Sequence, residues 1–213
     1  MPGALNIARG MMARPTSPEN AMRSLLVILG ILLAAPAWPA DIAVDTVLLV
    51  AKRNLHDRVY GETVLVTRPI GRDRHVGFIV NKPTQLTLGK LFPNDGPSQK
   101  VVEPVYLGGP ASSSVIFALV QAKQAPEGRL LRLGPELYLA YETKEVDRII
   151  ATQPAHSRFF AGMVIWQPGE LAQEIRRGLW YVLDPQPDLV LRKSTDHLWQ
   201  DLVDRAERKD NTI

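Results

Sequence analysis

The feature that most constrains the fold is a series of short β-branched and apolar runs separated by turn residues. Runs such as 46–51 (TVLLVA) and 62–67 (ETVLVT) are bounded by polar stretches that contain glycine or proline, a pattern typical of short strands joined by turns. We predict strands over 46–51, 62–67, 76–80, 104–107, 115–120, 129–133, 137–141, 159–166, 180–183 and 188–191.

Helical spacing is confined to fewer segments. We predict helices over 143–151, from Pro168 to near Gly178, and after a cap at Ser194 or Thr195, with one or two helical turns in 86–92. Strands and helices do not alternate regularly, which favours an α+β fold over a doubly wound parallel sheet. We therefore expect a mainly antiparallel sheet flanked by three to four helices.

The first forty residues have the pattern of an export signal. An apolar run over 25–35 follows Arg23 and leads into the small-residue exit Ala35-Pro36-Ala37. The run is shorter than the roughly 20 apolar residues that a membrane-spanning helix needs. We predict a leader over 1–40, cleaved after Ala37 or Ala40, and a single domain over 41–213, with no stable membrane span after cleavage.

This leader predicts a periplasmic protein, and an uncleaved N-terminal membrane anchor is the alternative. Residues 1–21 precede Met22, which would itself open an ordinary leader, so they are consistent with an overextended start site.

Charge and cysteine content exclude several classes of function. Removing residues 1–37 removes three arginines and Glu19, so the basic residues fall from 25 to 22 and the acidic residues from 22 to 21. This balance lacks the excess of positive charge by which nucleic-acid binders gain affinity. The absence of cysteine excludes disulfides, thiolate metal sites and a cysteine nucleophile.

Four segments, taken in order, resemble the AlgH/YqgE-like family. They are 76–83 (VGFIVNKP), 106–110 (YLGGP), 161–171 (AGMVIWQPGEL) followed by Trp180, and the last helix with Leu198-Trp199. The resemblance implies an α+β fold with a branched, barrel-like sheet. Members of the family have been labelled transcriptional regulators without a recognised DNA-binding motif, and most look cytoplasmic. The leader departs from that pattern and argues against the regulator label.

The motif residues suggest a ligand site, and each also has a structural interpretation. Asn81 and Lys82 bring an amide and a cation to a strand end, which suggests a small polar pocket, although Asn81 can also bond its own backbone in a turn before Pro83. Gly108-Gly109 can present backbone N–H groups to an anion or form a tight turn. Trp166 can stack on a ligand or fill a corner of the core, as can Trp180 and Trp199.

No residue pattern identifies a catalytic centre. His56 and Asp57 are adjacent, and adjacent residues on a strand point to opposite faces, so we do not expect a dyad. The sequence has no His-x-x-x-His, Gly-x-Ser-x-Gly or Ser-x-x-Lys pattern. We therefore predict no catalytic residue, metal ligand or cofactor.

The leading functional hypothesis is an exported, noncatalytic domain that binds a protein partner in the cell envelope and does not bind nucleic acid. One alternative is a small hydrolase or transferase with a polar site near Asn81, Lys82 and Gly108. The other is a transcriptional regulator, as the family label suggests.

Overall fold

The structure is a computed structural model that describes residues 46–210 of the 213-residue chain. The predicted leader over 1–40 lies outside the described residues. The predicted domain is therefore described from its first strand almost to its C-terminus.

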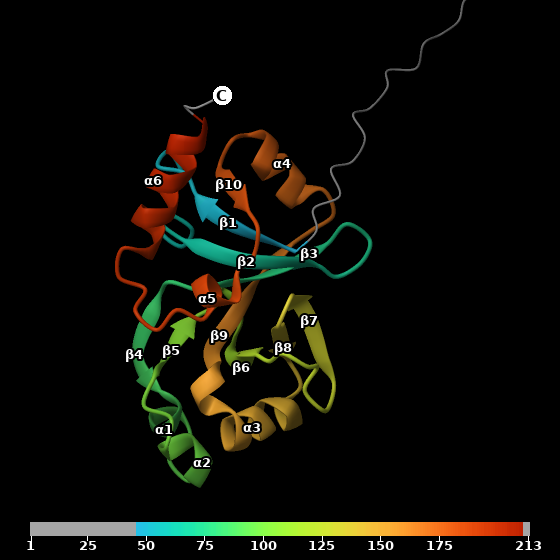
Figure 1. Ribbon diagram of the computed structural model, residues 1–213, viewed down its shortest axis with the longest axis vertical. Helices are drawn as coiled ribbons and strands as arrows, with labels where there is room; N and C mark the ends of the chain where they lie inside the picture. Colours follow the sequence, from blue (N-terminus) through green and yellow to red (C-terminus); the bar gives the residue numbers. More distant parts are fainter. Residues whose placement is uncertain (1–45, 211–213) are drawn as a thin grey trace, which may run out of the picture. The chain divides into compact units, whose positions relative to one another are not determined.

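Within residues 46–210, ten strands form one branched sheet (Figure 1). The main path runs β10-β1-β2-β3-β9-β6-β8-β7, and every neighbouring pair along it is antiparallel. The strands are β1 (Val47–Ala51), β2 (Val64–Pro69), β3 (His75–Ile79), β4 (Pro83–Thr87), β5 (Pro104–Leu107), β6 (Ala111–Gln121), β7 (Leu130–Gly134), β8 (Leu137–Ala140), β9 (Ser157–Trp166) and β10 (Trp180–Leu183). The sheet curls into a half-barrel, which confirms the predicted α+β class and the branched, barrel-like, mainly antiparallel sheet.

The branch lies along β9. Residues 157–163 of this strand pair with β6, and residues 164–166 pair with β3. Strand β5 runs parallel to β9 and pairs with it at Phe160 and Ala161. Strand β6 occupies one edge of β9, so β5 pairs with the opposite edge, at residues that precede those paired with β3. Strand β4 pairs with β5 and therefore lies off the main path of the sheet.

Six α-helices flank the sheet within the described residues, and three of them exceed one turn. They are α1 (Leu88–Leu91), α2 (Gly96–Gln99), α3 (Thr143–Thr152), α4 (Glu170–Arg176), α5 (Pro187–Val190) and α6 (Leu198–Asp210), with a short 3-10 turn over Pro154–His156. Helix α3 packs on β6 and β8, whereas α4 and α6 pack on β10 and β1 (Figure 1). No helix in this part of the chain has both the length and the apolar character to cross a bilayer.

The first strand is buried on both faces. Leu48 and Val50 belong to the central core that α6 also enters, while Leu49 and Ala51 belong to the core beneath α4. The sequence of a strand that is buried on both faces is continuously apolar and does not alternate between apolar and polar residues. This explains why the sequence TVLLVA does not alternate.

Several sequence predictions were wrong in detail. The predicted strand over 188–191 is instead the short helix α5, because Pro187 occupies its first position, where a fixed φ and a missing N–H favour a helix. The predicted helix from Pro168 begins only at Glu170, after Gly169 in a left-handed conformation. Strand β4 and helix α2 were not predicted.

Asp95 caps α2 by accepting a hydrogen bond from the backbone N–H of Ser98.

Candidate functional site

Asn81 extends the pairing of β2 and β3 with its side chain. Its Oδ1 accepts a hydrogen bond from the backbone N–H of Val64 at 2.8 Å, and its Nδ2 donates to the carbonyl of Glu62 at 2.9 Å. The amide thus bonds backbone groups 17 and 19 residues away, not its own backbone as the turn interpretation proposed. Both ends of the Asn81 amide are therefore committed to the fold.

Lys82 holds the loop between β1 and β2. Its Nζ donates to the carbonyls of Val59 and Gly61 at 2.9 and 3.2 Å. Burial lowers the pKa of Lys82 from its usual value, and the nearby carboxylates of Glu62 and Asp57 oppose that shift. Lys82 also lines a hollow of about 450 Å³.

This hollow lies where the sequence suggested a polar pocket as one of two interpretations, beside Asn81 and Lys82. The rest of its wall comes from Gly61 and Glu62, and from residues on and just before α6, namely Thr195, His197, Trp199 and Gln200. Gly108, Gly109 and Trp166 do not line it. The five predicted site residues therefore do not form a single site.

Gly108 and Gly109 lie at the fork where β3, β5 and β9 meet. The backbone N–H of Gly108 donates to Ala161, and its carbonyl accepts from Ile79. A Cβ at Gly108 would lie 2.2 Å from the carbonyl oxygen of Gly162, and a Cβ at Gly109 would lie 2.3 Å from the carbonyl carbon of Met163. At both positions the backbone of β9 lies so close that a side chain has no room, so glycine is needed there.

Trp166 is a buried residue of the core. Its side chain is 3% exposed, and its indole N–H donates to Glu174 Oε2 at 2.9 Å. Trp180 donates to the same oxygen at the same distance. Trp199 donates to the carbonyl of Ala51 at 2.7 Å. In each case the polar end of the indole is satisfied inside the fold, as the core interpretation expects.

The adjacent His56 and Asp57 do not form a dyad. Nδ1 of His56 lies 2.9 Å from the carbonyl oxygen of Asn54, whereas Asp57 Oδ1 accepts from the backbone N–H groups of Val59 and Tyr60. Both residues lie in the loop after β1, not on a strand. Within residues 46–210, no three His, Cys, Asp or Glu side chains are grouped to hold a metal ion.

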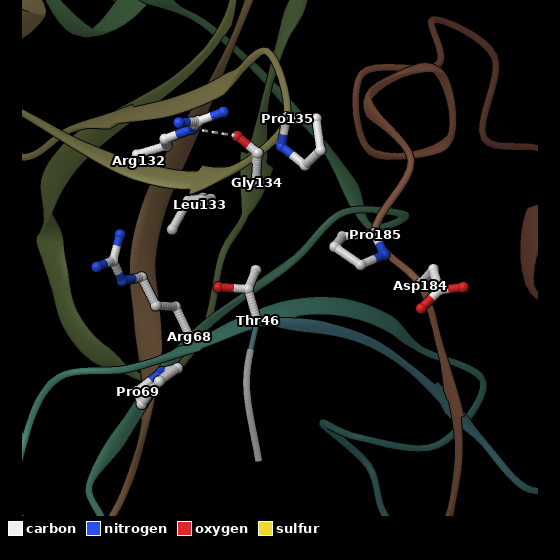
Figure 2. A pocket seen from close by; sticks show the side chains of 9 residues that line it. All are labelled: Thr46, Arg68, Pro69, Arg132, Leu133, Gly134, Pro135, Asp184 and Pro185. Carbon is white, nitrogen blue, oxygen red and sulfur yellow. Dashed lines mark hydrogen bonds between the residues drawn. The ribbon is translucent and has the colours of Figure 1, made fainter. Parts of the chain in front are cut away.

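A larger groove lies between β2 and the β7–β8 hairpin (Figure 2). It has a volume of about 620 Å³ and is lined by Thr46, Arg68, Pro69, Arg132, Leu133, Gly134, Pro135, Asp184 and Pro185. Arg68 and Arg132 extend along one side of it with Leu133 between them, and Asp184 lies across from them (Figure 2). We call this feature the arginine groove.

Both arginines of the groove keep guanidinium N–H groups available for a ligand. The Nε of Arg132 donates to the carbonyl of Gly134 at 3.1 Å, and neither guanidinium forms an ion pair with another residue of the described domain. Arg132 is exposed and Arg68 is half-buried. A planar guanidinium left free in this way can bind a carboxylate through two parallel hydrogen bonds.

The arginine groove was not predicted from the sequence. Arg68 and Arg132 are 64 positions apart, and each lies in a strand with no local motif. The only local signal was the turn at Gly134-Pro135, which the sequence did predict. Only the curl of the sheet brings the two strands to one groove.

Comparisons with known proteins identify the family. Residues 48–210 match the AlgH-like family profile. A UPF0301 protein of Chlorobium luteolum is 28% identical over 159 residues, which cover 73% of this chain and 82% of the relative. A UPF0301 protein of Streptomyces avermitilis is 27% identical over 169 residues, which cover 76% and 86%.

Two solved structures share the fold. A crystal structure of a Corynebacterium diphtheriae protein aligns with a TM-score of 0.64 at 23% identity, covering 76% of this chain and 86% of that chain. The solution structure of the AlgH protein from Pseudomonas aeruginosa aligns with a TM-score of 0.61 at 21% identity, covering 75% and 87%. The profile match spans nearly all of the described domain, and the predicted family is confirmed: the chain belongs to the AlgH-like family.

Proposed function

We propose that this chain is an exported, noncatalytic binding domain that holds a protein partner of the cell envelope in the arginine groove. The observation that carries the proposal is the pair of guanidinium groups, Arg68 and Arg132, on one side of an open groove and without an ion pair in the described domain. Two cations presented in this way favour a ligand with carboxylate groups.

The shape of the groove favours an extended segment of a partner chain. Pro69, Pro135 and Pro185 contribute rigid walls, which reduces the conformational entropy lost on binding. Asp184 on the opposite side repels an acidic side chain placed there. The acidic side chains of the partner therefore face Arg68 and Arg132.

The noncatalytic part of the proposal rests on how the reactive side chains are used. Asn81 and Lys82 bond backbone groups, and the Glu174 carboxylate accepts two indole N–H groups. Catalysis needs a nucleophile and a base in mutual hydrogen-bonding geometry. The residues singled out by their sequence motifs are instead occupied in holding the fold.

The hollow beside Lys82 supports a second candidate function, a small hydrolase or transferase. Lys82 has a pKa lowered by burial and lies near His197 in a hollow of about 450 Å³. A substrate screen of the purified chain tests this function. Turnover that is lost in Lys82→Ala and Asn81→Ala would establish it, and turnover unaffected by both would exclude this hollow.

The export part of the proposal rests on the apolar run over 25–35 and its small-residue exit. Fractionation of native cells, with the intact mass of the protein from each compartment, tests it. A soluble periplasmic species that begins at Trp38 or Asp41 supports export and argues against the regulator alternative. A cytoplasmic species that retains 25–35, with a salt-dependent shift of DNA in a gel, would favour that alternative.

In-cell photo-crosslinking tests the binding site itself. A photoreactive residue in place of the exposed Pro135 should crosslink to a defined envelope protein, whereas one in place of the exposed Pro168, outside the groove, should not. Arg68→Glu combined with Arg132→Glu should abolish the Pro135 crosslink. The control pair Lys100→Glu and Lys144→Glu reverses two exposed cations outside the groove and should leave the crosslink unchanged. Crosslinks that survive the arginine reversal would overturn the proposal.

A further inference from the structure

Strand β7 ends the main path of the sheet and has a neighbour on one edge only. It pairs with β8, and no other strand within residues 46–210 pairs with it (Figure 1). Arg132, one of the two cations of the arginine groove, lies on this strand. The wall of the groove therefore includes part of an edge strand, whose main chain can take part in binding.

The hydrogen bonds between β6 and β8 show which way the backbone groups of β8 point. The N–H of Ala122 donates to the carbonyl of Glu136 at 2.9 Å, in the same register as the paired residues of the two strands. Along an antiparallel ladder, hydrogen-bonded pairs alternate with pairs that are not hydrogen-bonded. Tyr138 and Ala140 therefore bond β6, and Leu139, between them, directs its N–H and C=O groups to β7.

The same alternation assigns the backbone groups of β7. Leu139 lies opposite Leu131, so this pair carries the hydrogen bonds between β7 and β8. The N–H and C=O groups of Leu130 and Arg132 then point away from β8, to the open edge. No other main-chain group of the described domain bonds these four groups. The edge thus presents two donors and two acceptors to a partner.

The side chains of Leu130 and Arg132 share one face of β7, because the two residues are two positions apart. Leu130 packs on the core that α3 covers, and Arg132 is exposed. On a strand added to this edge, the residues opposite them would lie on the same face and in contact with them. An acidic residue matches Arg132, and an apolar residue two positions away matches Leu130.

The edge is short, which limits what can pair with it. The register shifts between Arg132 and Gly134, and Pro135 follows without a backbone N–H. A short edge interrupted in this way resists pairing with arbitrary strands. Side-chain matching to Arg132, and to Arg68 in the same groove, then decides which segments bind.

We propose that the acidic segment of the partner binds as an added β-strand on the free edge of β7. In this mode, main-chain hydrogen bonds supply affinity and side chains supply specificity. This binding mode rests on the proposed function of the arginine groove, and it specifies how the partner is held. It narrows the partner to an extended segment with an acidic and an apolar residue two positions apart.

Peptides with N-methylated backbones test the proposal by fluorescence anisotropy with the purified full chain. Complete N-methylation of a labelled hexaglutamate keeps its carboxylates but removes every backbone donor, so we expect its affinity to fall at least about tenfold. Methylation of alternate residues is the control. It leaves one edge of the peptide free, because successive N–H groups point to opposite edges. This peptide should bind within about threefold of the unmodified one.

The three peptides separate failure of this binding mode from failure of the groove. Equal affinity of all three, with affinity lost in the Arg68→Ala, Arg132→Ala double variant, would overturn the added strand and leave the groove as a site for side chains alone. No binding of the unmodified peptide, or binding that does not need the two arginines, would overturn both proposals.

Solvent exchange of single amide protons, measured by NMR, locates the added strand. Saturation with hexaglutamate should slow exchange at Leu130 and Arg132 by at least about fivefold. Strand β10, at the other end of the path, is the matched control, because the N–H groups of Trp180 and Val182 also point to a free edge. Exchange should not change there. Exchange that stays fast at Leu130 and Arg132 would contradict the proposal.

The variants Arg132→Pro and Arg132→Ala isolate one main-chain group. Both lack the guanidinium, and only the proline variant also lacks the N–H at the open edge, where proline is tolerated. A folded proline variant, judged by its thermal midpoint, should bind hexaglutamate at least about threefold more weakly than the alanine variant. Equal binding would count against the added strand. If the proline variant does not fold, the methylated peptides and the exchange at Leu130 and Arg132 decide.

Discussion

The indole ring of Trp166 lies directly over Gly77, a diagonal neighbour on the adjacent strand. A Cβ at Gly77 would come 2.7 Å from Cζ3 of this ring and 3.0 Å from Cη2. The register pairs Gly77 with Val164, two residues before Trp166, so the ring leans across β3 instead of standing away from the sheet. Two residues of separate sequence motifs thus pack against each other, and glycine is needed at position 77 because a Cβ there would collide with the ring.

Gly77→Ala should therefore destabilise the domain. The added methyl group clashes with a ring that is itself fixed at its N–H end, so we expect a loss of about 2 kcal/mol in the free energy of unfolding by urea. Gly96→Ala is the matched control, because a Cβ there meets no atom within 4 Å. That variant should stay within about 1 kcal/mol of the wild type. Equal stability of the two variants would contradict the packing described here.

Glu174 is expected to join α4 to the sheet through its two indole bonds. Glu174→Ala removes the acceptor shared by Trp166 and Trp180 and leaves the N–H groups of two buried indoles unpaired. We expect a loss of about 2 to 3 kcal/mol and a shift in tryptophan fluorescence. Glu174→Gln keeps one acceptor oxygen and should lose less. An alanine variant as stable as the wild type would show that these bonds contribute little.

Asp57 should make the loop after β1 sensitive to acid. Its pKa lies below the ordinary value of 3.8, because the backbone N–H groups of Tyr60 and Val59 donate to the carboxylate. The stabilisation from its charge is present above that ordinary value and is lost as pH falls through the lower pKa of the folded state. The variant Asp57→Asn keeps an acceptor oxygen but lacks the charge. Its free energy of unfolding should lie below that of the wild type by a constant amount from pH 7 to 5, and this difference should disappear at lower pH. Urea unfolding at each pH measures it; a deficit that does not change with pH would exclude a contribution from the charge.

Lys82→Met should loosen the loop over 57–62 without unfolding the core. The substitution removes the two hydrogen bonds to Val59 and Gly61, so we expect a loss of about 1 kcal/mol. Hydrogen exchange should accelerate in the loop and stay unchanged in β6 and β9. Acceleration spread evenly over the domain would instead indicate a global role for Lys82.

The sequence predicted the strands of this fold more accurately than the connections between them. Runs such as 46–51 and 159–166 are rich in apolar residues because their strands are buried, so composition alone identifies them. The segment 188–191 is equally apolar but short, and a run of this length does not distinguish a strand from a turn of helix. Pro187 decided the outcome in favour of helix α5.

The candidate sites were less predictable, because they depend on contacts distant in the sequence. The sequence allowed either a polar pocket or a turn at Asn81 and Lys82, and the backbone groups that these side chains bond could not be inferred from it. Gly108 and Gly162 approach each other only because two strands share one edge of β9. Arg68 and Arg132 carry no local motif, and their proposed role follows from what the folded sheet places around them.

We propose that the arginine groove binds acidic segments of protein. The most direct test is the fluorescence anisotropy of a labelled hexaglutamate peptide with the purified full chain. We expect saturable binding that weakens as salt rises, with an affinity at least about tenfold lower in the Arg68→Ala, Arg132→Ala double variant. The Lys100→Ala, Lys144→Ala double variant should bind as the wild type does. Binding that is unchanged by loss of the two groove arginines, or absent in the wild type, would contradict the claim.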